Sequence, residues 1–241
     1  MNNIAIILAG GKGTRMNVES RPKQFVEVKG KPIILYTLEW FENHPEIDGI
    51  VIVCLESWIP YLQNKIAEYG IDKVFDIVPG GLTGQESIYH GLLSVEKMES
   101  RTDSLVLIHD GVRPLIDGKT ISDNIRIARN QGNCITCTPA PETIIVNRND
   151  VIMDIPNRNE ILIAKAPQTF IFKDILSAHR RSIVEKKMGF IDSCTMMHYY
   201  GYELHTLAGP VNNIKITTMM DLEVFKSIIE QELDVNKMIY M

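Results

Sequence analysis

Glycines and cations are concentrated near the start of the chain, in LAGGKGTRM followed closely by RPKQF. Glycine tolerates positive φ, so Gly10, Gly11 and Gly13 can turn consecutive N–H groups toward one point, and such a nest binds phosphate oxygens. Arg15 can contact two oxygens of one phosphate, and Lys23 adds a point charge. The stretch therefore predicts a phosphate site just after the first strand.

Two familiar nucleotide-binding motifs do not fit this stretch. The Walker A loop requires GxxxxGK followed by Ser or Thr, and GGKGTRM lacks that pattern. The dinucleotide fingerprint GxGxxG needs a small residue where Met16 stands, and RPKQF interrupts the helix that should follow. A dehydrogenase would also need an acidic residue closing the second strand, and Glu56 lies too far from the glycines for that role.

Polar residues also follow a later apolar run, in IHDGVRP. Asp110 ends the expected strand, where a carboxylate can bind Mg²⁺ together with phosphate oxygens or can instead cap a turn. Arg113 is expected to pair with nearby carboxylates or to order the loop. We expect His109 to be a buried core residue because of its strand position.

The CxxC formed by Cys134 and Cys137 has two readings, a reactive or metal-binding pair and a pair of core residues. Residues three apart in a strand point to opposite faces, and no second Cys or His pair follows at zinc spacing. We therefore expect two small core side chains.

Apolar runs without alternation recur along the chain and are typical of strands covered on both faces. They occupy 4–9, 49–55, 73–78, 104–109 and 133–140, with helical patterns at 32–43, 57–69, 85–98, 118–131, 173–187, 192–201 and 218–234. LHTLAG and NNIKIT are expected as short strands. This alternation predicts one α/β domain over 1–241, with a Rossmann-like, doubly wound, mostly parallel sheet and ligands at the carboxyl ends of its strands. The segment 141–165 breaks the rhythm and predicts a projecting β-arm used for dimerisation.

Composition excludes some classes of binding partner. The 241 residues carry a net charge of −5, which argues against a nucleic-acid or membrane surface. No apolar stretch approaches the ~20 residues of a membrane span, and the start lacks the features of a signal peptide. We expect a cytoplasmic protein that binds small anions in a local basic pocket.

The combined motifs resemble the cytidylyltransferases that make CDP-alcohols from polyol phosphates, whose members act on methylerythritol 4-phosphate or ribitol 5-phosphate. The matching blocks are LAGGKGTRM, RPKQF, GG followed by ES at 80–87, IHDGVRP, ETI at 142–144, IPNR, APQTF and NNIKITTMMDL, in the family's order over nearly the whole chain. The resemblance implies CTP and a polyol phosphate as substrates, Mg²⁺ as cofactor and a homodimer with composite sites.

The resemblance also implies roles for individual residues. The catalytic residues are Arg15, Lys23 and Lys215, and the nucleotide-binding residues are Leu8, Ala9, Gly10, Gly11, Gly13, Thr14, Gly80, Gly81 and Ser87. The substrate-binding residues are Asp110, Thr143, Arg158 and Asp192, with Asp110 also binding the metal and the arm residues reaching a neighbouring subunit. Asp192 could equally be a helix N-cap. Gly84 departs from the family pattern, in which Arg is usual at this position, and that departure bears on CTP preference.

The arm distinguishes the two substrates better than the nucleotide loop does. MDIPNRNEILIAKAPQTF is similar to the pattern of the ribitol 5-phosphate enzymes, and Lys12 in the first loop favours the same assignment. We therefore favour ribitol 5-phosphate, a precursor for surface polymers, over methylerythritol 4-phosphate. An alternative of another class is a non-catalytic nucleotide-binding protein, which would have no need of Asp110 together with both lysines.

Overall fold

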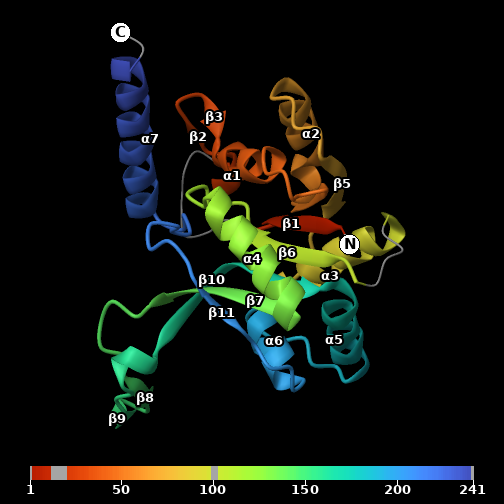
Figure 1. The fold of residues 1–241 in the computed structure, drawn as a ribbon, viewed down its shortest axis with the longest axis vertical. Helices are drawn as coiled ribbons and strands as arrows, with labels where there is room; N and C mark the ends of the chain where they lie inside the picture. Colours follow the sequence, from red (N-terminus) through yellow and green to blue (C-terminus); the bar gives the residue numbers. More distant parts are fainter. Residues whose placement is uncertain (1, 12–20, 99–102, 240–241) are drawn as a thin grey trace.

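A mixed β-sheet forms the centre of the structure (Figure 1). The computed structural model describes residues 2–11, 21–98 and 103–239, with side chains up to residue 231. Within this part of the chain, the main sheet has the order β11-β7-β10-β6-β1-β4-β5. Its strands are β1 (Asn3–Ala9), β4 (Gly49–Cys54), β5 (Val74–Pro79), β6 (Leu105–Asp110), β7 (Asn133–Pro139), β10 (Leu162–Ile171) and β11 (Thr206–Ala208). Only β10 runs against its neighbours in this sheet, so the predicted mostly parallel α/β sheet is confirmed.

Alternation along the central strands sends side chains to two layers of helices. Ala5 and Ile7 of β1 are buried in a cluster with residues of α1, α2 and α4. Ile4 and Ile6 are buried in a second cluster with residues of α3, α5 and α6. The helices are α1 (Ile33–Glu42), α2 (Ile59–Glu68), α3 (Gly84–Met98), α4 (Gly118–Gln131), α5 (Phe172–Val184), α6 (Ser193–Tyr199) and α7 (Met219–Ile239). Cover on both faces explains why the strands read as continuous apolar runs.

A third apolar cluster joins α7 to a small antiparallel ribbon beside α1. The ribbon consists of β2 (Glu27–Val28) and β3 (Lys31–Pro32). Phe225 of α7 is buried, and its ring meets that of Tyr36 edge-on, with centroids 5.2 Å apart. This contact connects the last helix to the segment that follows RPKQF. Within RPKQF, Lys23–Phe25 form the short 3₁₀ helix η1.

The arm projects away from the sheet and its helices (Figure 1, lower left). It contains the antiparallel pair β8 (Val146–Arg148) and β9 (Val151–Asp154) and the 3₁₀ helix η3 (Arg158–Glu160). Asn149 and Asp150 make the turn with φ of 51° and 62°, a left-handed conformation that Asn and Asp tolerate better than most residues. The predicted hairpin is confirmed. Its use in dimerisation stays a prediction.

The structure differs from the predicted strands in two places. The segment 212–217 was expected as a short strand but forms a loop. It crosses the ends of the central strands, where the Ile216 amide donates to the Val112 carbonyl at 2.9 Å. None of its residues pairs with a described strand in a ladder. The strand β10 was also unexpected, because its first residues extend from the arm into the sheet and their pattern changes along the strand from exposed to buried.

The CxxC pair has the structural role expected from its spacing. Cys134 and Cys137 are both buried in β7, one in each of the two main apolar clusters. Burial raises the pKa of both thiols, that of Cys134 to about 12. Neither a thiolate nor a paired metal ligand is favoured there.

Among the described helices, none combines the length and apolarity that crossing a membrane requires.

Candidate active site

A cavity of about 660 Å³ opens at the carboxyl ends of β1 and β6. It is bounded on one side by the start of α3 and on the other by β10 and the start of α6. This is the edge at which open α/β sheets bind ligands. Of the residues predicted for the site, the following line it: Leu8, Ala9, Gly10, Gly11, Lys23, Gly81, Ser87, Asp110, Asp192 and Lys215.

Other predicted residues lie elsewhere. Gly80 is next to the cavity, with its Cα near Gly10, but does not line it. Thr143 and Arg158 are exposed in the arm and are not brought to the cavity of their own chain. Gly13, Thr14 and Arg15, together with Lys12, fall outside the described residues.

The loop before α3 is shaped by hydrogen bonds to its own side chains. The Gly81 amide donates to Ser87 Oγ at 3.0 Å, and that hydroxyl donates to the Thr83 carbonyl at 2.9 Å. A side chain at Gly81 would clash with Glu86, whose carboxylate accepts from the Leu82 amide at 2.7 Å. These internal hydrogen bonds hold the loop in a fixed conformation at the cavity wall.

Gly84, the departure from the family pattern, opens α3 at the cavity wall. A Cβ at this position would meet no described atom within 4 Å. Space therefore does not require glycine here, and the site simply lacks the cation that an arginine would supply.

Gln24 is a buried residue of RPKQF that the sequence analysis did not single out. Its Nε2 donates to the Ala9 carbonyl at 2.6 Å and to the Gly11 carbonyl at 3.2 Å. These bonds fix the path of the glycine loop where it leaves β1. A polar residue beside Phe25 in RPKQF was the available signal, because a buried amide must find hydrogen-bond partners.

Asp110 is held between two cations. One carboxylate oxygen accepts from Lys215 Nζ at 2.7 Å and the other from Arg113 Nε at 2.9 Å. Burial alone would raise the pKa of Asp110, but Lys215 and Arg113 outweigh it and hold the pKa well below its usual range. Arg113 also donates to the Asn213 carbonyl at 3.0 Å, which anchors the loop that carries Lys215. The expected pairing of Arg113 is confirmed.

His109 is buried beneath this cluster, as its strand position indicated. Burial lowers its pKa to about 4. The imidazole is neutral at physiological pH, and its Nε2 lies 3.2 Å from the Arg113 carbonyl. It packs against Phe41 and belongs to the core.

Asp192 is a helix N-cap that also lines the cavity. Its Oδ1 accepts from the Thr195 amide at 2.8 Å, at the start of α6. Its Oδ2 accepts from Gln168 Nε2 at 3.0 Å, while Gln168 Oε1 accepts from the Cys194 amide at 2.9 Å. The capping role is thereby confirmed, and Gln168 of APQTF emerges as the side chain that ties α6 to β10.

Gln85 connects the start of α3, on one side of the cavity, to the end of α5 and the segment before α6, on the other. Its Nε2 donates to Ser182 Oγ at 2.8 Å and to the Lys187 carbonyl at 3.2 Å, and its Oε1 accepts from the Phe190 amide at 3.3 Å. Gln85 lies in the first turn of α3, close to Gly81, and its hydrogen bonds order the segment that leads to Asp192. It is a positioning residue that sequence spacing alone did not reveal.

The site suits a magnesium ion that takes most of its ligands from substrate. Among the described residues, Asp110 and the N-cap Asp192 are the carboxylates that line the cavity, and no group of three or more His, Cys, Asp or Glu is arranged to hold a metal. Mg²⁺ is commonly bound by one or two carboxylates plus phosphates and water. Each oxygen of Asp110 keeps a lone pair beyond the one used by its cation.

Comparisons with known proteins agree with this geometry. A family model described as IspD, 2-C-methyl-D-erythritol 4-phosphate cytidylyltransferase, matches residues 3–231. A ribitol-5-phosphate cytidylyltransferase of Vibrio parahaemolyticus is 46% identical over 95% of this chain and 97% of its own.

A 2-C-methyl-D-erythritol 4-phosphate cytidylyltransferase of Clostridium botulinum is 40% identical over 95% of this chain and 98% of its own. The crystal structure of a 4-diphosphocytidyl-2C-methyl-D-erythritol synthase from Anaerococcus prevotii superposes with a TM-score of 0.81 at 26% identity, covering 95% of this chain and 96% of that one. The chain therefore belongs to the IspD family of cytidylyltransferases and is a nucleotidyltransferase.

Proposed function

We propose that the enzyme transfers the cytidylyl group of CTP to D-ribitol 5-phosphate, giving CDP-ribitol and pyrophosphate. The observation that carries the proposal is the placement of Asp110, Lys215 and Lys23 around one cavity at the strand ends, opposite the ordered loop at Gly81 that leads into α3. That arrangement suits a triphosphate and a base in one site.

The chemistry requires alignment and charge rather than a side-chain nucleophile. A phosphate monoester oxygen of the polyol phosphate attacks the α-phosphorus of CTP, and the bond to the pyrophosphate oxygen breaks. The attacking oxygen is already ionised at neutral pH, so no general base is needed. Lys23 and Lys215 offset the charge that accumulates on the five-coordinate phosphorus, in a role that also fits Arg15 of the first loop.

Asp110 is the residue proposed to hold Mg²⁺. The bound ion would neutralise triphosphate oxygens and the leaving pyrophosphate. Asp110 also keeps Lys215 in place at 2.7 Å. Arg113 retains its contact to the other carboxylate oxygen and keeps the loop of Asn213 fixed to the end of β6.

Ribitol 5-phosphate is preferred over methylerythritol 4-phosphate on two grounds. The arm reads DIPNR before APQTF, the pattern that resembles ribitol 5-phosphate enzymes. The relative at 46% identity carries the ribitol-5-phosphate name, whereas the one at 40% carries the methylerythritol name. Both relatives match the chain over 95% of its length, so the comparison does not depend on unequal coverage.

Pyrophosphate release tests the proposal directly. The purified chain is assayed with CTP, Mg²⁺ and either D-ribitol 5-phosphate or methylerythritol 4-phosphate, and kcat/KM for the ribitol compound should be at least about tenfold higher. Lys215→Met should slow release by about 10²–10³-fold, while Lys119→Met, which changes an exposed lysine of α4, should not. A preference for methylerythritol 4-phosphate would support the alternative substrate. Binding of CTP without release from any polyol phosphate would indicate a non-catalytic binder.

The arm is proposed to complete the site of a second subunit, with Thr143 and Arg158 at the polyol phosphate. Support comes from the exposed apolar side chains of the hairpin, such as Val151 and Ile152, and from the distance of the arm from its own sheet (Figure 1). A projecting apolar hairpin buries that surface most readily against another copy of the same chain.

Subunit mixing tests this composite site. Arg158→Ala and Lys215→Met are each expected to be nearly inactive. After unfolding and refolding together in equal amounts, half of the dimers are mixed and one of their two sites carries neither change, so about a quarter of wild-type activity should return. No recovery, with the dimer still present by light scattering, would place Arg158 in its own subunit's site, and full activity of Arg158→Ala alone would place it outside any site.

A further inference from the structure

Lys165 lies in an irregular part of β10 at the edge of the cavity. β10 pairs with β7 through Ala164 and Cys137 and again through Gln168 and Ile135, so the residues between interrupt the ladder. Such bulges turn a side chain away from the direction that regular pleating would give it. Here the interruption coincides with a lysine that lines the cavity.

The position along β10 puts Lys165 close to the reacting centre. Gln168 pairs with Ile108 in the antiparallel ladder with β6. Residues before Gln168 in β10 therefore run past Asp110 at the end of β6. Lys165 Nζ donates to the Val211 carbonyl at 3.2 Å, on the loop that leads to Lys215.

The charge of Lys165 has no anion assigned to it among the described residues. The carboxylate of Asp110 is taken by Lys215 and Arg113, and that of Asp192 by hydrogen bonds at the start of α6. The described lining contains the cations Lys23, Arg113, Lys165 and Lys215 against the carboxylates of Asp110 and Asp192. A local surplus of positive charge on a chain with net charge −5 indicates an anionic ligand.

The environment of Lys165 also disfavours its ammonium unless an anion is near. Burial, and then the neighbouring Arg113, lower its pKa. An anion between the two cations would reverse both effects, because it would replace lost hydration and separate like charges.

The position of Lys165 in the cavity indicates which substrate anion it binds. Gly10 and Gly11 follow β1, and Gly81 and the start of α3 follow β5, on the far side of β1 from Asp110; they are the part proposed for CTP. Lys165 lies on the opposite side, on β10 with Gln168, whose side chain contacts Asp192. We infer that Lys165 is a further binding residue of this enzyme, whose ammonium holds the phosphate monoester of the acceptor substrate beside Asp110 and Lys215. The inference rests on the proposed function for the identity of that acceptor.

Paired substitutions test the role of the charge. Lys165→Met keeps most of the aliphatic stem and removes the ammonium, whereas Lys165→Arg keeps a cation. We expect the KM for D-ribitol 5-phosphate to rise about tenfold to a hundredfold in the methionine variant, the range for losing one hydrogen bond to a charged group, with the KM for CTP changed less than about twofold. The arginine variant should recover most of the loss.

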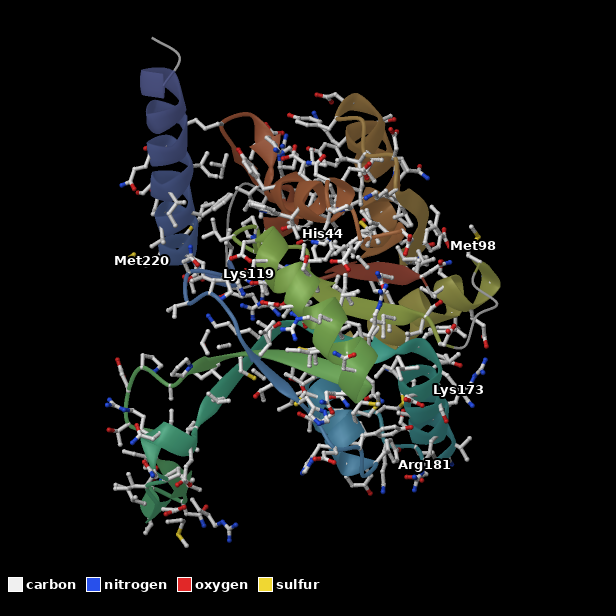
Figure 2. The ribbon with its side chains drawn as sticks, in the orientation of Figure 1. His44, Met98, Lys119, Lys173, Arg181 and Met220 are labelled. Carbon is white, nitrogen blue, oxygen red and sulfur yellow. The ribbon has the colours of Figure 1, made fainter. Side chains whose placement is uncertain are left out.

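Lys173→Met is the matched control, because Lys173 lies on α5 away from the cavity (Figure 2). It should leave both KM values unchanged. An unchanged KM for the polyol phosphate in Lys165→Met would overturn the inference, as would an equal rise for both substrates or a rise for CTP alone. Unfolding of the methionine variant would be recognised by its melting curve, and the KM values of Lys165→Arg and Lys165→Gln would then decide.

Failure of the proposed function is distinguishable from failure of this inference. If the wild type uses another polyol phosphate, the same variants are compared on that substrate. If it releases pyrophosphate with none, calorimetric titration of inorganic phosphate into the CTP-loaded wild type and Lys165→Met decides. Weaker phosphate binding by at least about tenfold in the variant would support a phosphate site at Lys165, and equal binding would refute it.

Discussion

The buried histidine His179 makes the stability of the fold depend on acid. Its side chain lies in α5 with 1% of its surface exposed and stacks on Tyr89, with ring centroids 5.9 Å apart. Its Nε2 is buried without a hydrogen-bond partner among the described atoms. Burial lowers the pKa of His179 from 6.5 to about 4. The folded state therefore keeps this imidazole neutral in a range where the unfolded chain protonates it.

The sign and size of the effect follow from linkage. The folded pKa is the lower one, so the stabilisation is complete above pH 6.5 and is lost as the pH falls toward 4. The full difference corresponds to about 3 kcal/mol, and about 2 kcal/mol is lost by pH 5. His179→Gln removes the titrating group, so the variant should lose about 2 kcal/mol less than the wild type between pH 7.5 and 5.

Urea unfolding, followed by circular dichroism at several pH values, measures this difference. The quantity compared is the change in unfolding free energy with pH, so an overall loss of packing in the variant does not affect the conclusion. His198→Gln is the control, because it removes an exposed imidazole from α6. His179→Phe, which fills the site without a polar atom, should show the same reduced dependence. Equal losses in the wild type and in both His179 variants would refute the reasoning.

Three further outcomes concern the active site. Lys23→Met and Lys215→Met should each lower kcat by about 10²–10³-fold with little change in melting temperature, as measured by pyrophosphate release and calorimetry; parallel losses of activity and stability would make them structural. Asp110→Asn should raise the Mg²⁺ concentration for half-maximal rate at least about tenfold, and an unchanged Mg²⁺ titration would remove Asp110 from the metal site. Gln85→Leu should lower the unfolding free energy by about 1–3 kcal/mol, because it removes the Gln85 amide from the Phe190 amide and the Lys187 carbonyl, and should raise KM for both substrates; wild-type values in chemical denaturation and kinetics would contradict its positioning role.

The repeating pattern of apolar runs predicted the sheet well because burial on both faces leaves little freedom. The runs at 4–9 and 49–55 correspond to β1 and β4, and the helix expected at 118–131 is α4 with the same bounds. Asp117 caps that helix by accepting from the Thr120 amide, and Gly132 ends it with φ of 88°. Local signals and global packing agree at these places.

Prediction was weaker where long-range contacts decide the local structure. The segment 212–217 has the composition of a strand, but Arg113 and the Val112 carbonyl hold it as a loop across the strand ends. Gln24, Gln85 and Gln168 were missed for a similar reason. Each acts through hydrogen bonds to residues distant in sequence, and a glutamine in a motif carries no signal of its partner.

β10 gives the enzyme a direct physical connection between its projecting arm and the floor of its cavity. The strand leaves the arm at Leu162, passes the cavity with Lys165 and Gln168, and ends in the buried sheet at Ile171. Arg158, proposed for the site of a partner subunit, and Lys165, proposed for the site of its own chain, therefore lie on one short stretch of backbone. Replacing that stretch as a unit would change proposed acceptor residues in both sites of a dimer while leaving β1 and α3 unaltered.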